Sequence, residues 1–295
     1  MFLPEFIFHQ PVTIGEALGL LEKGNNAVAM AGGTDLLVEM KKGLRAHDEI
    51  VSLAKIDEIK WISEDESNVY IGACVTHNEI IGSSLIHMYI PVLANAASKI
   101  GSDQIRNSGT IGGNLCTAAS CCDSAPILLA MNASVEVLSA SGIRTIALAD
   151  FFTFNKKTVL SPGELVTRVI IPKPSAGTGA HYEKFGLREA GSISVVSVAA
   201  RIRIEHGTIA DACVVIGAVA PTPRISTGAS EVLKGRKADE ILQDGQLLHE
   251  AGEAAVKDSI PIDDIRGGAQ YRRDVLHVIA RRAIVSAAKV AMLTK

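Results

Sequence analysis

Two kinds of hydrophobic pattern divide this chain. Up to about residue 170, short apolar runs that predict strands alternate with amphipathic stretches that predict helices. Residues 13–23 begin the series as a predicted helix, because their apolar positions share one face, Thr13 can cap the start and Gly24 can end it. A short apolar strand is predicted at residues 27–30. Further strands are predicted at residues 49–53, 69–71, 134–139 and 164–171, and further helices at 36–42, 76–83, 91–100 and 124–131.

The remainder of the chain has a different pattern. Residues 173–179 are rich in Pro, Gly and Ser and are the best linker candidate. Beyond them, long apolar runs predict an antiparallel sheet, with His206-Gly207 as a hairpin turn. The predicted strands are 182–187, 195–204 and 212–220, and the predicted helices are 229–233, 247–256 and 271–293. We therefore predict an α+β protein with an N-terminal domain at 1–175, subdivided at about 1–55 and 56–175, and a C-terminal α+β domain at 180–295.

Two glycine-rich stretches are the strongest candidate binding elements. The first is Ala31-Gly32-Gly33-Thr34-Asp35, and the second is residues 106–114, with glycines at 109, 112 and 113. Paired glycines let backbone N–H groups approach an anion closely, and a helix start behind them adds partial positive charge. Two such turns could hold a pyrophosphate from both sides. Each could also be an ordinary tight turn, and residue chemistry alone leaves the two interpretations evenly balanced.

Neither turn matches a common nucleotide-binding motif, since the chain has no Gly-Lys-Ser/Thr sequence and neither stretch is Gly-x-Gly-x-x-Gly. Asp123 could accept hydroxyl hydrogen bonds from a ribose or ribityl chain, although it precedes an apolar run and a helix N-cap is the simpler interpretation. The cationic side chains of Lys184 and Arg188 could contact an anionic or electron-rich ring, but each residue alone is more typical of a solvated surface charge.

Three of the five cysteines, Cys116, Cys121 and Cys122, lie within seven positions. Their C-x4-C-C spacing has no nearby fourth ligand that would complete an iron–sulfur pattern, so we interpret them as small hydrophobic packing residues. His77 and His181 give no metal-ligand spacing with neighbouring His, Asp or Glu residues. We therefore expect no metal site on this chain.

Composition excludes several classes of protein. Hydrophobic residues make up 47% of the chain, which is enough for a packed core. Aromatic residues make up only 4% and the formal net charge is −3, so a surface for nucleic acid is not expected. An odd number of cysteines argues against a secreted disulfide scaffold. We see no targeting segment and no run long enough to span a bilayer, and we expect a cytoplasmic protein.

Several motifs together resemble the FAD-binding subunit of the xanthine dehydrogenase / carbon monoxide dehydrogenase family of molybdenum hydroxylases. Besides the two glycine turns, they include Asp123-Ser-Ala-Pro126, Tyr182-Glu-Lys-Phe-Gly-Leu-Arg188 and Gly217-Ala-Val-Ala-Pro-Thr-Pro-Arg224. The motifs occur in the family's order over nearly the whole chain. The resemblance implies an FAD-binding domain of the vanillyl-alcohol-oxidase/PCMH type, built of two α/β subdomains, followed by a C-terminal α+β domain.

The resemblance also implies which residues hold FAD. The first turn would wrap the pyrophosphate, the second would supply a further phosphate-side loop, Asp123 would hold sugar or ribityl hydroxyls, and Lys184 would hydrogen-bond near the isoalloxazine ring. The implied cofactor-binding residues are Val28, Ala29, Met30, Ala31, Gly32, Gly33, Thr34, Asp35, Leu36, Ala73, Ile100, Gly109, Thr110, Ile111, Gly112, Gly113, Asn114, Thr117, Asp123, Leu165, Lys184 and Ile193. No residue is implied to be catalytic in its own right.

The function implied by the resemblance is electron relay. A molybdopterin-binding large subunit would oxidise the substrate, [2Fe–2S] clusters on a small subunit would pass electrons to FAD on this chain, and NAD or another acceptor would receive them. The assembly would be a dimer of heterotrimers. Ile100 replaces an aromatic residue of some relatives, and residues 113–135 leave no room for the [4Fe–4S] insertion of others. Two alternatives are a stand-alone FAD oxidase of the vanillyl-alcohol-oxidase type and a non-catalytic nucleotide-binding subunit.

Overall fold

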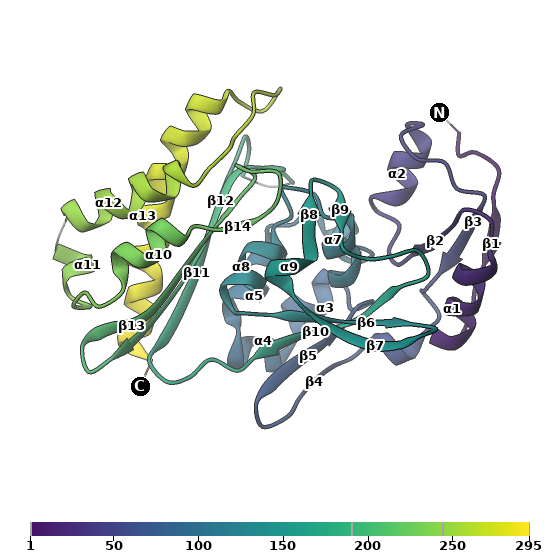
Figure 1. The fold of residues 1–295 in the computed structure, drawn as a ribbon, viewed down its shortest axis with the longest axis horizontal. Helices are drawn as coiled ribbons and strands as arrows, with labels where there is room; N and C mark the ends of the chain where they lie inside the picture. The colour runs from purple at the N-terminus through teal and green to yellow at the C-terminus, as the bar shows by residue number, and fades with distance from the viewer. Residues whose placement is uncertain (1, 190, 244, 295) are drawn as a thin grey trace.

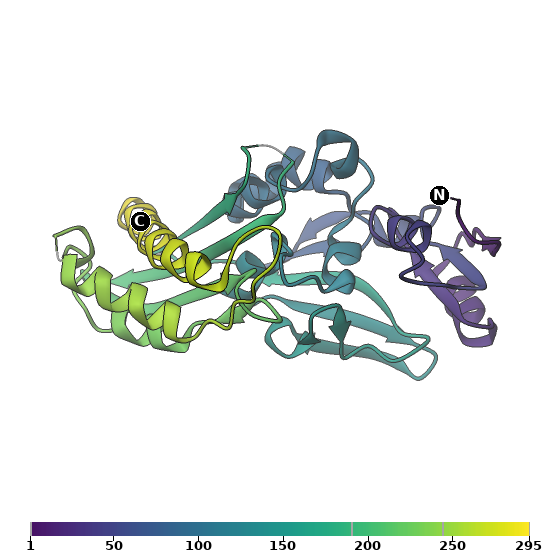
Figure 2. The ribbon, with the colours of Figure 1, turned by 90° about the horizontal axis from the view of Figure 1, so that it is seen from above.

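The computed structural model describes residues 2–189, 191–243 and 245–294. Three sheet-centred units follow one another from one end of the molecule to the other, with the N-terminus and the C-terminus in the two outer units (Figures 1 and 2). Helices and strands are mixed in all three units, so the predicted α+β class is confirmed. None of the helices in the described ranges is long and apolar enough to cross a membrane.

The first unit is a small parallel sheet in the order β1-β3-β2. Its helix α1 begins as predicted, because the Thr13 side chain accepts a hydrogen bond from the N–H of Glu16. In return, the Glu16 carboxylate accepts a hydrogen bond from the N–H of Thr13. Gly24 ends the helix as predicted. The elements are β1 (Ile7–His9), α1 (Ile14–Lys23), β2 (Ala27–Met30), α2 (Leu36–Lys41) and β3 (Glu49–Ser52).

The second unit is a five-stranded sheet in the order β4-β5-β10-β6-β7. The buried central strand β10 pairs antiparallel with both β5 and β6. Helices between β5 and β6 cover one side, and every residue of α8 is buried. The elements are η1 (Asp57–Ile59), β4 (Ile62–Glu64), β5 (Asn68–Gly72), α3 (His77–Gly82), α4 (Ser84–Tyr89), α5 (Pro91–Ser98), α6 (Asp103–Arg106), α7 (Ile111–Thr117), α8 (Ser124–Ala130), β6 (Ser134–Ser139), β7 (Gly142–Ala147), α9 (Leu148–Phe151), β8 (Phe152–Phe154), β9 (Lys157–Thr158) and β10 (Leu165–Pro172).

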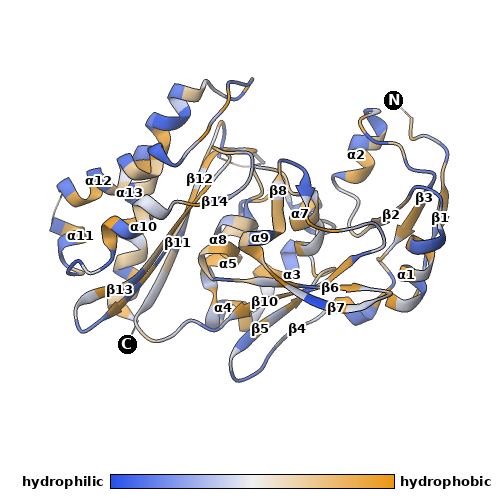
Figure 3. Cartoon of the chain, viewed as in Figure 1, coloured by the Kyte–Doolittle hydropathy of each residue, from blue (hydrophilic) through white to orange (hydrophobic). Residues whose placement is uncertain are grey.

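The third unit is an antiparallel sheet in the order β11-β12-β13-β14, with α8 on one face and a helical layer on the other. His206 and Gly207 both have positive φ, which confirms the predicted hairpin between β12 and β13. In Figure 3, hydrophilic segments alternate with hydrophobic ones on the outer helix α12, whereas hydrophobic residues gather on the interior helices α5 and α8. The elements are β11 (Thr178–Gly186), β12 (Ser194–Glu205), β13 (Thr208–Gly217), β14 (Arg224–Ile225), α10 (Thr227–Leu233), α11 (Glu240–Gln243), α12 (Gly245–Lys257) and α13 (Ala269–Leu293).

Several short elements, among them β1, β4, α4 and α6, were not predicted, and three further differences stand out. Strand β11 already begins at Thr178, inside the segment predicted as a linker. Strand β7 was missed because most of its residues are exposed and its two isoleucines, Ile143 and Ile146, do not follow the strand period of two. Helix α7 was missed because Gly112 and Gly113 were interpreted as a turn, although Gly112 lies inside the helix. A Cβ at Gly112 would lie 2.7 Å from the Ala73 Cβ, so helix packing requires that glycine.

Candidate functional site

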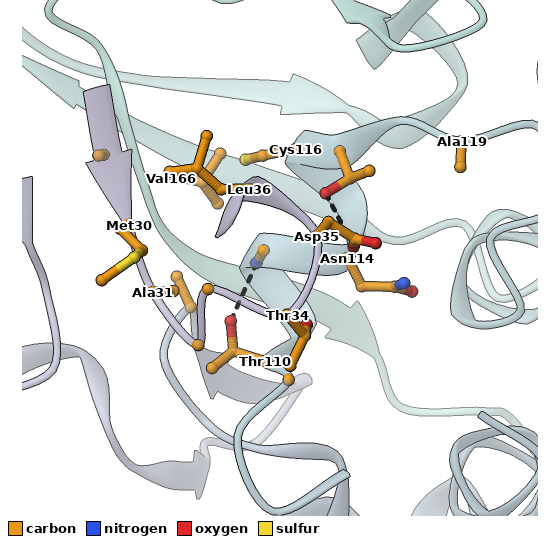
Figure 4. Close-up of a pocket in the computed structure, with 18 of the residues that line it drawn as sticks. Met30, Ala31, Thr34, Asp35, Leu36, Thr110, Asn114, Cys116, Ala119 and Val166 are labelled. Carbon is orange, nitrogen blue, oxygen red and sulfur yellow. Dashed lines mark hydrogen bonds between the residues drawn. The ribbon is translucent and has the colours of Figure 1, made fainter. Parts of the chain in front are cut away.

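Residues from the first two units, together with residues 191–193, line one pocket with a volume of about 680 Å³. Figure 4 shows the part of it where the end of β2 and the start of α2 face α7. The volume lies within the range of pockets that enclose a small molecule or a cofactor. Both glycine-rich turns contribute to its lining, so the fold brings together two motifs that lie far apart in the sequence.

The first glycine turn presents a row of unused backbone donors. Gly33 has a φ of +69°, which lets the chain turn sharply between β2 and α2. Over the part of the chain that the structure describes, the N–H groups of residues 32–36 donate to no acceptor. Successive unpaired N–H groups in such a turn form a concave anion site. The Asp35 carboxylate accepts a hydrogen bond from the Thr117 hydroxyl at 3.2 Å, which ties this turn to α7 (Figure 4).

The second glycine turn is used differently. The N–H of Gly112 donates to the Ala73 carbonyl at 2.9 Å, and the N–H of Gly113 donates to the Thr110 hydroxyl at 3.1 Å (Figure 4). Ile111 likewise donates to the Val75 carbonyl at 3.0 Å. These donors are therefore occupied within the fold. Of residues 109–114, only Thr110 keeps a backbone N–H with no partner among the described residues.

The two turns are packed directly on each other. A Cβ placed on Gly32 would lie 1.7 Å from the carbonyl oxygen of Ser108. This approach is closer than any side chain permits, so glycine at position 32 is required by the contact between the turns. The second turn thereby supports the first and fixes its position over the pocket.

Asp123 is the centre of a buried polar cluster at the pocket wall. It occupies the N-cap position of α8, but its side chain makes no capping hydrogen bond, so the helix-cap interpretation does not describe its contacts. Instead, its carboxylate accepts hydrogen bonds from the hydroxyls of Tyr182, at 2.7 Å, and Ser194. The Lys184 ammonium lies 2.6 Å from the other carboxylate oxygen. A carboxylate has about four lone-pair sites, so roughly one remains for a further donor in the pocket.

Lys184 lies behind Asp123 and not in the pocket itself. Its side chain is only 7% exposed, and its ammonium also donates to the Lys99 carbonyl at 2.8 Å. Because Lys99 precedes Ile100 and Ser194 follows Ile193, the ion pair connects the two segments that carry these predicted isoleucines. The pair thus forms a rigid polar support beneath this end of the pocket.

His77 is a pocket residue that sequence reasoning did not select. It is 2% exposed, and its Nδ1 atom has no hydrogen-bond partner among the described residues. Burial, reinforced by the positive charge of Arg106, lowers the pKa of His77 to about 4, so the ring is neutral at pH 7. A buried ring nitrogen without a partner costs free energy, which a hydrogen-bonding ligand in the pocket would recover. No sequence spacing around His77 could have shown this.

Most of the residues expected at the cofactor site do line this pocket. The exceptions are Ile111, which is fully buried beneath it, and Lys184. Ile193 is 58% exposed, whereas Ile100 is buried. The expected residues that line the pocket are Val28, Ala29, Met30, Ala31, Gly32, Gly33, Thr34, Asp35, Leu36, Ala73, Ile100, Gly109, Thr110, Gly112, Gly113, Asn114, Thr117, Asp123, Leu165 and Ile193.

Cysteines also reach this site. Cys116 and Cys121 line the pocket, and the Cys122 thiol lies 2.9 Å from the Asn114 side-chain oxygen. Burial raises the pKa of the Cys122 thiol to about 12, which keeps it protonated. Across the described ranges, the pocket contains no group of His, Cys, Asp or Glu close enough to hold a metal ion.

Comparison with known proteins identifies the class to which this fold and pocket belong. Residues 4–174 match the family described as "FAD binding domain in molybdopterin dehydrogenase", and residues 180–287 match "CO dehydrogenase flavoprotein C-terminal domain". The chain therefore belongs to the FAD-binding medium subunits of the carbon monoxide and xanthine dehydrogenase type. It is an oxidoreductase component, as the resemblance predicted.

Relatives agree over almost the full length of the chain. The carbon monoxide dehydrogenase medium chain of Hydrogenophaga pseudoflava is 30% identical, covering 97% of this chain and 98% of its own. The xanthine dehydrogenase FAD-binding subunit of Escherichia coli O157:H7 is 28% identical over 95% of both. A solved structure of carbon monoxide dehydrogenase from Hydrogenophaga pseudoflava superposes with a TM-score of 0.93 at 30% identity, covering 97% of this chain and 98% of that one.

Proposed function

We propose that this chain binds one FAD in the described pocket and relays electrons within a molybdenum hydroxylase. Electrons would arrive from [2Fe–2S] clusters of a small partner subunit and leave to NAD or another acceptor. A molybdopterin-binding large subunit would complete the assembly, as a dimer of heterotrimers. Bound FAD would supply the redox chemistry, since its ring system exchanges electrons singly or in pairs. The residues of this chain supply position and electrostatics.

The observation that carries this proposal is the row of unused N–H donors at residues 32–36 inside a pocket of cofactor size. A pyrophosphate needs several donors and need not have a cationic side chain, because backbone N–H groups in a turn provide partial positive charge. The packing of Gly32 on Ser108 holds these donors in place before any ligand arrives. Such preorganisation lowers the entropic cost of binding.

The second turn would contribute the Thr110 N–H and the polar side chains of the turn to the cofactor. The other N–H groups of this turn donate within the fold and would hold the site in shape. Asp123 would offer its remaining acceptor position to a hydroxyl of the cofactor. Lys184 would act through Asp123, holding that carboxylate in its orientation near the end of the pocket where Ile100 lies. His77 would use its free Nδ1 toward a polar group of the cofactor. Leu165 would provide backbone contacts on the opposite side of the pocket.

The substrate of the assembly is a separate question. Relatives of similar identity carry the names glyceraldehyde dehydrogenase medium chain, nicotinate dehydrogenase FAD-subunit and nicotine 6-hydroxylase medium subunit. Such different names on chains of one fold support the view that this subunit does not select the substrate. We place that selection on the molybdenum-containing partner.

The direct test is to purify the chain, record its visible spectrum and add dithionite. We expect flavin bands that bleach on reduction, with one FAD per chain. A colourless protein that does not take up added FAD would contradict the proposal. Oxidation of a substrate by the isolated chain would favour a stand-alone oxidase. For the relay, we expect molybdenum and iron to co-purify with two further polypeptides, and NADH to form when the reduced complex meets NAD⁺.

A further inference from the structure

Two histidines and a glutamate come together where α12 packs against α13. Both helices belong to the helical layer on the outer face of the third unit (Figures 1 and 2). His249 and Glu253 are four residues apart on α12, so they share one face of that helix. His277 comes from α13. One ligand-type atom from each of the three lies within 4.8 Å of the other two.

The His277 ring is held in place by an unusually close helix contact. A Cβ on Gly252 would lie 2.7 Å from Cδ2 and 2.9 Å from Nε2 of this imidazole, so only glycine leaves room for the ring. Gly252 is buried and lies between His249 and Glu253 on α12. The ring thereby packs against α12 next to His249, and the His249 and His277 ring centroids are 5.0 Å apart, edge to face.

The Nε2 atom of His277 lacks a hydrogen-bond partner. It is inaccessible to solvent and makes no hydrogen bond to any described residue. The nearest charged oxygen, Oε1 of Glu253, is 3.6 Å away, which is too long for a hydrogen bond. Two ligand atoms of a tetrahedral zinc ion are about 3.3–3.5 Å apart, because each Zn–N or Zn–O bond is about 2.0–2.1 Å. The separation of this pair is therefore close to that of two ligand atoms on one metal ion.

We propose that His249, Glu253 and His277 bind one divalent transition-metal ion of the zinc type, which joins α12 to α13. Two imidazoles and one carboxylate form a borderline donor set that suits Zn²⁺, Co²⁺ and Ni²⁺ better than Mg²⁺ or Ca²⁺. Three protein ligands leave at least one position for water. Because the metal binds only the folded arrangement of the two helices, it stabilises the C-terminal domain. This site is independent of FAD.

The test is calorimetric titration of the full-length, chelator-treated chain with Zn²⁺. We expect one ion per chain, and a loss of Zn²⁺ affinity of at least about 100-fold in His249→Ala and in His277→Ala. Removing a residue that only hydrogen-bonds to a metal ligand already lowers metal affinity by about 10–100-fold. His206→Asn is the matched control, because it removes an exposed histidine in a hairpin turn where asparagine tolerates the positive φ. It should bind like the unaltered chain.

Melting of the same proteins provides a second measurement. Zn²⁺ should raise the melting temperature of the unaltered chain and of His206→Asn, but not of His249→Ala, whose exposed side chain is removed without disturbing the core. The absence of binding at about 1 mM Zn²⁺ would overturn the proposal. Binding that survives both histidine substitutions but is abolished by alkylating the cysteines would also overturn it, because the ion would then lie on thiols.

Discussion

Replacing Gly32 by alanine tests the idea that contact between the two glycine turns builds the cofactor site. The new Cβ would lie 1.7 Å from the Ser108 carbonyl oxygen, whereas such contacts are not seen below 3.0 Å, so the turns must separate by at least the difference of 1.3 Å. A displacement of about 1 Å can cost about 100-fold where several groups must converge. We therefore expect FAD affinity to fall about 100-fold, or about 2.7 kcal/mol. Strain in the packed contact should also lower the free energy of unfolding by about 1–3 kcal/mol.

The assay is titration of the FAD-free chain with FAD, followed by the quenching of flavin fluorescence, with urea unfolding measured on the same samples. Gly19→Ala is the matched control, because no atom lies within 4 Å of a Cβ at that position of α1. It should leave FAD affinity unchanged and raise stability by about 0.5–1 kcal/mol, as expected for glycine replaced by alanine inside a helix. Wild-type FAD affinity in Gly32→Ala would refute the reasoning.

Two further predictions concern the buried polar groups around the pocket. Lys184→Met leaves the Asp123 carboxylate buried without its cation, so the free energy of unfolding in urea should fall by about 3–5 kcal/mol, and the midpoint potential of bound flavin should shift. The double variant Lys184→Met with Asp123→Asn should lose less unfolding free energy than Lys184→Met alone. Equal losses in the two variants, together with an unchanged flavin potential, would contradict the coupling between Lys184 and Asp123. For His77, the pKa of about 4 in the folded chain lies below the ordinary histidine pKa of 6.5, so between these pH values only the unfolded chain binds the proton. The free energy of unfolding is therefore unaffected by the titration of His77 above pH 6.5. It falls as the pH drops from 6.5 to 4, by up to about 3 kcal/mol. His77→Gln should flatten this acid limb in urea unfolding, and parallel pH profiles would show the reasoning to be wrong.

Much of the fold could be predicted because its signals are local. The Thr13 capping box, the His206-Gly207 hairpin and the apolar stripe of α13 each depend on residues within a few positions of one another. Elements were missed where the local signal conflicts with the tertiary role. The isoleucines of exposed β7 do not follow the strand period, and Gly112 lies in helix α7, where close packing on Ala73 leaves no room for a side chain.

The amino-acid sequence by itself determined the order of elements, the two glycine turns and the family resemblance. Only the tertiary structure decided how these parts work together. It placed Gly32 on Ser108, left the donors of the first turn free while occupying those of the second, and assigned Lys184 to Asp123 and not to the pocket. It also brought His277 close to His249 and Glu253, although the sequence analysis had predicted no metal site. The reason is physical: contacts between distant residues depend on how helices and turns pack, and a local sequence pattern does not determine that packing.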